Sequence, residues 1–425
     1  SYFLRYIMIG EQDSGEYVFY ENDNLIVYMF MAIIVALFLG LTVSAEEIFK
    51  DQKIRKRESF LSLSKGSYLI SKIVIMFLLS GIQMFMFILL GNLILGIDGM
   101  LWDYWLILFS TACFANMLGL NISASFNSAV TIYIIIPFLI IPQILFSGVL
   151  VKFEKLNPVI TSQSIVPLIG EVMASRWAFE ALAVNQFVEN DYEKLFYDYD
   201  QQMSDANFKK NFWIPEMKAK VGKFKEYLRN KESADIQDLT SDFKTVRGEV
   251  SKENKFNDAI TFDELDQFTL GGINQELLED FSTYLTTLNK LYVRQWNYNI
   301  DEKDRVIREH QKTDEEKTAF NNLRNNFENE SLSDLVTNKN EFNQITEYDG
   351  ELIQRADPVF NIPDGFRSHF YAPKKLVFGK YYSTKQVNVL VLWLMSIALA
   401  ISLYFDGLKR LLNVFSEVKI FNKKK

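Results

Sequence analysis

The sequence predicts an all-α membrane protein with five transmembrane helices, six if a first span precedes residue 1, and a mainly helical external domain inserted before the last span. Three observations support this prediction. Long uncharged apolar runs recur along the chain, basic residues collect beside alternate ends of those runs, and a long acidic segment separates the fourth run from the fifth. Such runs are the sequence mark of membrane spans, and the basic residues orient them.

The first apolar run covers 25–45, has no charged residue, and has about the 20 residues that a helix needs to cross the hydrocarbon core. The other runs lie at 73–97, 104–126, 129–151 and 387–405. The run at 129–151 contains Pro137 and Pro142, which spanning helices tolerate where neighbouring helices satisfy the freed carbonyl groups. Buried helices of soluble proteins rarely stay uncharged for so long, so we expect these runs to cross a membrane.

Charge orients these spans. Segment 46–66 and the tail 406–425 each contain six lysines and arginines, whereas segment 1–24 contains one arginine and five acids. The positive-inside rule therefore places 46–66 and the tail in the cytoplasm and 1–24 outside. All five spans fit this one orientation. Because the chain starts at Ser1 without a methionine, we expect it to be part of a longer protein with a further span before residue 1.

The long segment between the last two spans is then external. It contains 40 acids and 31 bases, and a segment of this length crosses a membrane regardless of charge. We expect an outer re-entrant segment at 152–188 and a helical external domain at 189–386. Apolar residues at helical spacing follow the break at Gly271-Gly272, namely Leu277, Phe281, Tyr284, Leu285, Leu288 and Leu291. The aromatic, proline-containing stretch 346–386 predicts an irregular return to the membrane.

Several kinds of chemistry are excluded or disfavoured. The one cysteine, Cys113, excludes an intrachain disulfide, and the two histidines, His310 and His369, are far apart in sequence. No GxxxxGK[ST] motif occurs, so this chain has no phosphate-binding P-loop. We expect no metal, no catalytic site and no nucleic-acid partner. Asn116 in the third span could line a polar path, but such residues more often form hydrogen bonds between helices.

The cytoplasmic loop SAEEIFKDQKIRKRESFLSLSKGSYLISK (44–72) carries both signs of charge on an amphipathic frame. One interpretation is a solvated basic loop that fixes topology. The other is a short helix that docks on a cytoplasmic partner, with Glu47, Arg57 and Glu58 in salt bridges that set the docking register. Lys72, near the inner end of the next span, is expected to extend its ammonium group to the interface.

Three stretches resemble one family, the ATP-binding cassette exporters of the G-subfamily type, a class of type-2 permeases. They are Ser44-Ala45-x-Glu47 with Arg57-Glu58 and Tyr68-x-x-Ser71-Lys72; the run PQILFSGVLV at 142–151; and SRWAFEAL at 175–182. Their order and spacing agree with the topology above, and the resemblance covers about 25–187 and 387–405. The chain departs from the family in its much longer external segment, which lacks the usual cysteine pairs, and in having no nucleotide-binding domain.

The resemblance implies roles for particular residues. Segment 46–65 would be the coupling helix, with Glu46, Glu47, Arg57 and Glu58 coupling it to the ATPase domain. Glu47 would lie at the inner end of its span, in the polar network that links the span to the coupling helix. Val149 and Leu150 would form the outer gate, and Arg176, Trp177 and Glu180 would belong to the re-entrant helix. The central cavity between two protomers would be lined by Leu37, Gly40, Ile141, Ile144 and Asn116. The alternative for the cavity residues is ordinary lipid contact or helix packing.

The resemblance also implies a function. The chain would be the permease part of an ATP-driven exporter that moves an amphipathic or lipid-like substrate outward by alternating access between two protomers. ATP and magnesium would bind to the ATPase domain, and the other partners would be a second identical or related permease, membrane lipid and a periplasmic accessory protein. The expected location is a bacterial inner membrane, with 152–386 in the periplasm. The alternative is a membrane-anchored scaffold or mechanotransmission protein whose external domain binds a partner without transport.

Overall fold

A computed structural model describes residues 2–5, 17–57, 64–126, 128–157, 164–230 and 235–422 of the chain; the side chains of 52–56 and 415–422 are left aside. The described chain is mostly helical, at 72%. This confirms the prediction of a mainly helical protein. It divides into two compact units, which are described separately. The span unit comprises Ser1–Asp191, Leu323–Ser333 and Pro363–Lys425, and the second unit comprises Tyr192–Asn322 and Asp334–Ile362.

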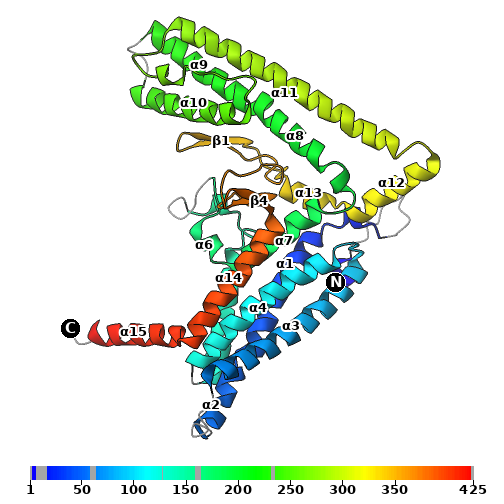
Figure 1. Cartoon of the computed structure of the whole chain (residues 1–425), viewed down its shortest axis with the longest axis vertical. Coiled ribbons are helices and arrows are strands. Elements are labelled where there is room, and N and C mark those ends of the chain that lie inside the picture. Colours follow the sequence, from blue (N-terminus) through cyan, green and yellow to red (C-terminus); the bar gives the residue numbers. More distant parts are fainter. Residues whose placement is uncertain are drawn as a thin grey trace. The chain divides into compact units, whose positions relative to one another are not determined.

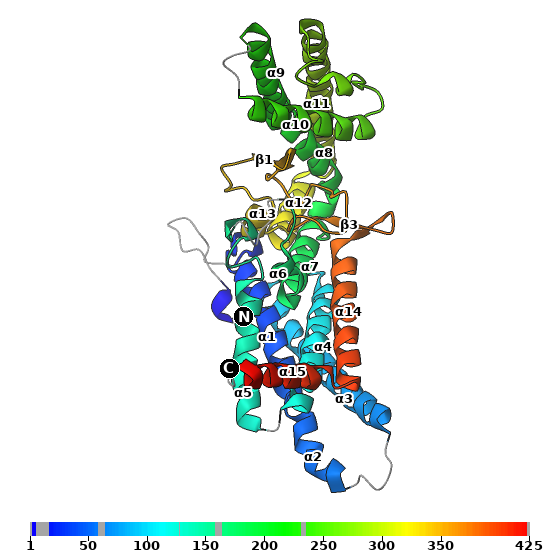
Figure 2. The same cartoon turned by 90° about the vertical axis from the view of Figure 1, so that its left-hand side faces the viewer.

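The span unit contains most of the apolar helices (Figures 1 and 2). Its helices and strands are α1 (Leu25–Ser44), α2 (Glu47–Arg57), α3 (Lys65–Leu95), α4 (Leu101–Ser125), α5 (Ala129–Leu145), α6 (Leu168–Glu171), α7 (Ala174–Val188), β3 (Lys374–Val377), β4 (Lys380–Ser383), α14 (Thr384–Tyr404) and α15 (Gly407–Asn422).

Four helices among the described residues are long and apolar enough to cross a membrane: α1 with its extension to Asp51, α3, α4 and α14. The remaining predicted span corresponds to α5, an apolar helix of only 17 residues. It ends at Leu145, before the predicted boundary, with Phe146 as its C-cap. The chain then turns at Gly148, whose φ of +82° is a conformation that glycine adopts without strain. Every predicted apolar run thus forms a helix, while the number of spans stays a prediction.

Helix α4 is the centre of the span unit, since it packs against α1, α3, α7 and α14. Small residues allow its close approach to α1. A Cβ atom built on Gly40 would lie 2.7 Å from both the Ala112 carbonyl oxygen and the Ala115 Cβ, so no larger residue fits there. Polar side chains also join the helices: Asn121 Nδ2 donates to the Leu399 carbonyl of α14 at 2.9 Å. Both devices are typical of helix packing in membranes, where apolar burial contributes little.

The second unit is a helical bundle with a small hairpin. It contains α8 (Tyr197–Phe208), a π-helical turn (Lys209–Trp213), α9 (Ile214–Arg229), α10 (Ile236–Phe256), α11 (Gln275–Glu309), β1 (Ile345–Tyr348) and β2 (Glu351–Gln354). Helices α12 (Asp314–Phe327) and α13 (Glu330–Val336) have residues in both units. The helical spacing predicted for 277–291 is confirmed, because its apolar residues lie in the core of this unit.

Two antiparallel hairpins, β1–β2 and β3–β4, occupy parts of the stretch that was predicted to be irregular. Each turns through two residues with positive φ: Asp349 and Gly350 at 52° and 78°, and Phe378 and Gly379 at 48° and 78°. This is the type I′ turn, which matches the natural twist of a two-residue hairpin. The Asp-Gly pair is a recognised signal for it, whereas Phe-Gly is not.

Candidate functional site

The start of α2 is fastened to α3 by a cluster of charged and polar side chains. The Lys72 ammonium of α3 lies 2.9 Å from a carboxylate oxygen of Glu47 and 2.9 Å from one of Asp51, both on α2. The Tyr68 hydroxyl donates to Asp51 at 2.9 Å. Lys72 is therefore paired with two carboxylates. From the sequence, its ammonium group is expected to extend to the membrane interface.

The same turn of α2 is also bound to α4. The backbone N–H groups of Ile48 and Phe49 donate to the Ser123 hydroxyl oxygen at 3.0 and 2.9 Å. The first N–H groups of a helix have no partner within it, so here a side chain of another helix satisfies them. Ile48 packs in a small buried cluster with Leu69 and Leu120. One turn of α2 is thus bound to α3 by ion pairs and to α4 by hydrogen bonds. It also follows α1 directly in the chain.

The predicted coupling residues occupy different environments. Glu47 pairs with Lys72 at the end of its span, while Glu46 pairs with the exposed Lys50 at 2.6 Å; their coupling role stays a prediction. Arg57 is exposed at the end of α2, and Glu58 lies outside the described residues. Asp51, Tyr68 and Ser123 were not singled out from the sequence. The four-residue spacings of 47 with 51 and of 68 with 72 could have indicated two facing helix surfaces.

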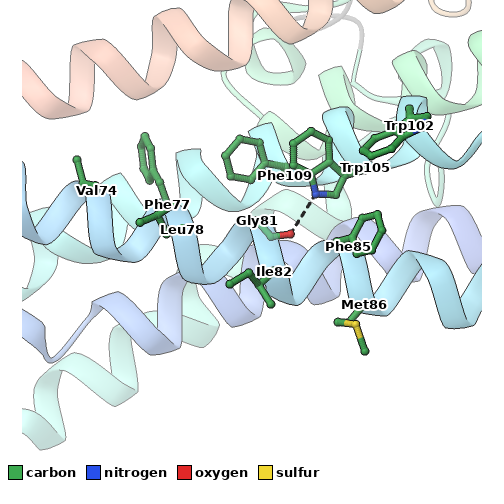
Figure 3. A pocket seen from close by; sticks show the side chains of 10 residues that line it. All are labelled: Val74, Phe77, Leu78, Gly81, Ile82, Phe85, Met86, Trp102, Trp105 and Phe109. Carbon is green, nitrogen blue, oxygen red and sulfur yellow. Dashed lines mark hydrogen bonds between the residues drawn. The ribbon is translucent and has the colours of Figure 1, made fainter.

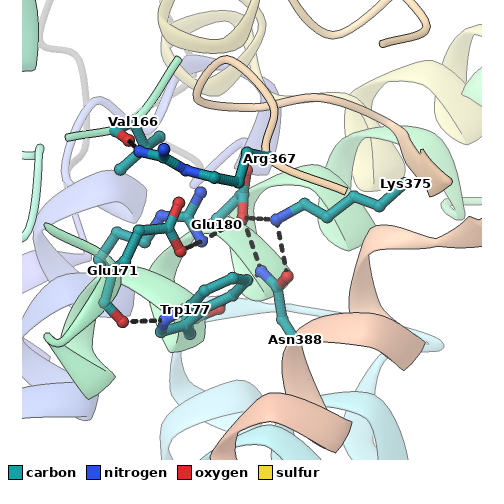
Figure 4. Close-up of polar contacts among 8 residues, drawn as sticks. Val166, Glu171, Trp177, Glu180, Arg367, Lys375 and Asn388 are labelled. Carbon is teal, nitrogen blue, oxygen red and sulfur yellow. Dashed lines mark hydrogen bonds and ion pairs between the residues drawn. The ribbon is translucent and has the colours of Figure 1, made fainter. Parts of the chain in front are cut away.

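A second cluster is buried around α7 (Figure 4). The Glu180 carboxylate accepts from the Lys375 ammonium of β3 at 2.6 Å and from Asn388 Nδ2 of α14 at 2.7 Å. Asn388 Oδ1 in turn accepts from Lys375 at 2.9 Å. Arg176 Nη1 lies 3.4 Å from Glu180 and 3.9 Å from Glu171. This network joins α7, the β3–β4 hairpin and the first turns of α14.

The charges of this network have almost no access to solvent. The side chains of Glu180 and Lys375 are 0% exposed and that of Arg176 is 1% exposed. Burial pushes the pKa of Glu180 upward, but the charges of Arg176 and Lys375 outweigh it and hold that pKa below its ordinary value. Burial lowers the pKa of Lys375 to about 8, against the opposing effect of Glu180.

The network is not fully satisfied by hydrogen bonds. Within the described residues, Arg176 Nε and Nη1 and Glu180 Oε1 have no hydrogen-bond partner. The guanidinium stacks instead on the Trp177 ring, with 4.0 Å from its central carbon to the ring centroid. Trp177 is fixed in turn by its indole N–H, which donates to the Glu171 carbonyl at 2.7 Å. The three predicted re-entrant residues therefore meet in one buried site, whose partner Lys375 was not predicted.

Three of the predicted cavity residues lie in helix contacts within the chain. Leu37 is 1% exposed, and Gly40 faces Ala112 and Ala115 as described above. Asn116 Nδ2 donates to the Ser80 hydroxyl of α3 at 2.7 Å. Within the chain, Gly40 thus packs against α4 and Asn116 bonds to α3, while the cavity-lining role of these residues stays a prediction. The alternative of helix packing describes their positions.

The other predicted cavity and gate residues are more accessible. Ile141 on α5 is 51% exposed and Leu150, in the turns after α5, is 60% exposed. Ile144 and Val149 are half-buried. These four residues can contact a neighbouring apolar surface without any rearrangement of the chain.

The span unit also has an apolar groove of about 570 Å³ between α3 and α4 (Figure 3). Its floor is Gly81, whose carbonyl oxygen accepts a hydrogen bond from the Trp105 indole N–H at 3.0 Å. The side walls are wholly aliphatic and aromatic, and they come from Val74, Phe77, Leu78, Ile82, Phe85, Met86, Trp102, Trp105 and Phe109. Such a groove suits an apolar chain and no charged group. None of these residues was predicted as a site.

Comparison with known proteins gives one match. The family model of the ABC-2 type transporter matches residues 5–187, a range that includes α1 to α6 and nearly all of α7. The searches of curated proteins and of solved structures found no match. The match covers less than half of the chain; together with the apolar helices, it supports an integral membrane protein. Permeases of this family typically act with an ATP-binding cassette ATPase.

Proposed function

We propose that this chain is the permease part of an ATP-driven exporter, in which α2 is the coupling helix. The observation that supports this most directly is the anchoring of one turn of α2 to α3 through Lys72 and to α4 through Ser123. A helix held in this way passes a displacement to several spans at once. The family match over 5–187, which includes α2, supports the same role.

The remaining part of α2 would receive the ATPase domain. The sequence from 53 to 57 contains four bases, Lys53, Arg55, Lys56 and Arg57. An acidic groove on the ATPase domain would complement this charge and fix the register of docking. ATP and magnesium would bind there, on the same or a separate polypeptide, and the closing of two such domains would displace α2. ATP binding would then favour one of two states of the spans, which is what alternating access requires.

The substrate path would lie between two copies of the permease, identical or related. Ile141, Ile144, Val149 and Leu150 are the predicted path and gate residues that reach the surface of this chain. They are all aliphatic, which favours an amphipathic or lipid-like substrate over a small ion. In this proposal, the basic loop and tail lie in the cytoplasm of a bacterial cell, and 152–386 lies in the periplasm, where an accessory protein could bind.

The test is ATP hydrolysis by the complex that purifies with a tag on this chain, reconstituted in lipid nanodiscs. Lys72→Met removes the pair with Glu47 and Asp51, and charge-assisted hydrogen bonds of this kind contribute about 1.5–3 kcal/mol each. We expect the variant to assemble but to lose stimulation of hydrolysis by lipid-like substrates. Lys65→Met is the matched control, because Lys65 on the same helix pairs with Asp406 at 2.6 Å with both side chains well exposed.

Equal hydrolysis and equal stimulation in Lys72→Met and wild type would contradict the coupling role of α2. If no ATP hydrolysis accompanies the purified chain at all, the alternative of a scaffold without transport gains support. Loss of stimulation in both Lys72→Met and Lys65→Met would indicate general damage to α3 rather than uncoupling.

A further inference from the structure

We propose that the β3–β4 hairpin is a membrane-surface anchor, with Phe378 inserted among lipid headgroups and with Lys374 and Lys380 on their phosphates. This inference goes beyond the proposed transport function. It requires only that α14 crosses the membrane.

The tip of this hairpin is built in an unfavourable way for folding alone. Phe378 is the first central residue of a type I′ turn and has a φ of 48°. Asparagine, aspartate and glycine are the residues preferred at this position, and a left-handed conformation costs other residues about 1–2 kcal/mol. Phe378 gains no burial in return, because its side chain is fully exposed at 102%. A residue that is both strained and exposed calls for a functional reason.

The hairpin presents aromatic and cationic groups together. Tyr381 is 48% and Tyr382 is 44% exposed, and Lys374 and Lys380 are exposed as well. A Cβ atom placed on Gly379 would meet nothing within 4 Å, so the tip projects into open space. Aromatic rings with polar edges and lysines that reach phosphates are typical of the membrane–water interface.

The hairpin also lies at the level where the membrane–water interface is expected, at the start of α14. Strand β4 runs directly into α14, and the Ser383 hydroxyl caps that helix by accepting from the Gln386 N–H at 3.4 Å. The Lys385 ammonium of α14 lies 2.8 Å from Asp103 of α4, so the two membrane helices begin side by side. Trp102 at the start of α4 is 66% exposed, as expected for an aromatic belt at the interface.

The direction of the hairpin keeps it at this level. Figure 2 shows the hairpin leaving the top of α14 sideways rather than along the helix axis. A four-residue strand such as β3 extends about 13 Å at 3.3 Å per residue. The base is fixed, because Lys375 is buried against Glu180 as described above. The tip therefore reaches over the lipid beside the protein. Anionic headgroups suit the two exposed lysines of the hairpin, Lys380 at the tip and Lys374 at the base, at about 1 kcal/mol each.

The experiment uses nitroxide spin labels on the full chain in lipid nanodiscs. Cys113 is the only cysteine and is buried, so a Cys113→Ala background accepts single labels at chosen sites. The label is placed at Phe378→Cys and, as a control, at Phe342→Cys, a residue of the second unit that is 99% exposed. Power saturation then compares collisions with oxygen, which dissolves in the bilayer, and with a nickel chelate, which stays in water.

We expect the label at 378 to collide more with oxygen and less with the nickel chelate than the label at 342. The fraction of labels at 378 that the nickel chelate cannot reach should grow when anionic phosphatidylglycerol replaces part of the phosphatidylcholine. Lys374→Gln and Lys380→Gln should each reduce the ratio of shielded to accessible labels about fivefold, the equivalent of about 1 kcal/mol. Equal nickel access at 378 and 342 would overturn the proposal. A label at 378 that is immobilised and shielded from both reagents would overturn it too, in favour of a contact with protein.

Discussion

Glu180→Gln should destabilise the span unit more than any exposed charge substitution. Of the three buried charged side chains in the network around α7, Glu180 is the acid, and it lies 2.6 Å from Lys375 and 3.4 Å from Arg176. Glutamine keeps the size of the side chain but removes the negative charge. Two buried cations then share one site, with only Glu171 at 3.9 Å from Arg176 to compensate.

The expected cost follows from the burial of this site. Breaking a buried ion pair by removing one partner costs about 3–5 kcal/mol, because the other charge stays buried without compensation. At about 2–4 °C per kcal/mol for a unit of this size, the midpoint of unfolding should fall by roughly 6 to 20 °C. The added substitution Lys375→Met removes one of the two cations, so the double variant should regain at least about 0.5 kcal/mol of the loss.

The assay can use the single cysteine of the chain. Cys113 lies buried in α4, so a maleimide dye that fluoresces on reacting with a thiol reports the unfolding of the span unit. Asp406→Asn is the matched control, since it makes the same chemical change in an exposed pair with Lys65. Exposed pairs contribute about 0–1 kcal/mol. If Glu180→Gln shifts the midpoint no more than Asp406→Asn does, the reasoning about the buried network is wrong.

Three further predictions concern the same unit. Gly40→Leu should lower the midpoint of thermal unfolding by the equivalent of about 1–3 kcal/mol, because its side chain would strike the backbone of α4; a midpoint equal to that of wild type would contradict the close packing. Lys375 loses its proton near pH 8 in the folded chain and near its ordinary pKa of 10.5 in the unfolded chain, so between these values the unfolded chain binds more protons. In this window the free energy of unfolding should rise with pH, relative to that of Lys375→Met, by up to about 1.4 kcal/mol per pH unit. Parallel curves of unfolding free energy against pH for the two proteins would contradict the lowered pKa. Ser123→Ala leaves the N–H groups of Ile48 and Phe49 without their acceptor, so ATP hydrolysis by the reconstituted complex should lose its stimulation by substrate while Ser125→Ala, on the same helix, keeps it.

The spans could be predicted because their signal is local. Length and lack of charge alone decide whether a run such as 25–45 can cross a membrane, and each predicted run forms a helix. The hairpins were missed because four-residue strands such as β1 and β3 are too short for a reliable alternation. The pair Asp349-Gly350 was the one local signal for a turn of this kind.

The candidate site could be predicted only in part. Glu47 and Glu180 were identified by resemblance, but Lys375 lies 195 positions from Glu180, and no local pattern connects the two. The sequence could not show which surface Leu37 and Gly40 face, because α1 is apolar on all sides and has no periodicity that distinguishes one face from another. Which face packs inside is decided by small residues on the neighbouring helix, here Ala112 and Ala115.

The close contact at Gly40 has a mechanical consequence. Backbone packed against backbone cannot slide without a clash, so α1 and α4 behave as one stiff strut, and α2 is joined to it covalently through Ala45 and by hydrogen bonds to Ser123. The grip of α2 on α3 is instead ionic, through Lys72, and an ion pair tolerates sliding and exchange of partners. If α2 has the proposed coupling role, a displacement of α2 would move α1 and α4 as a block, and α3 would follow through its ion pairs with α2 and its hydrogen bonds with α4.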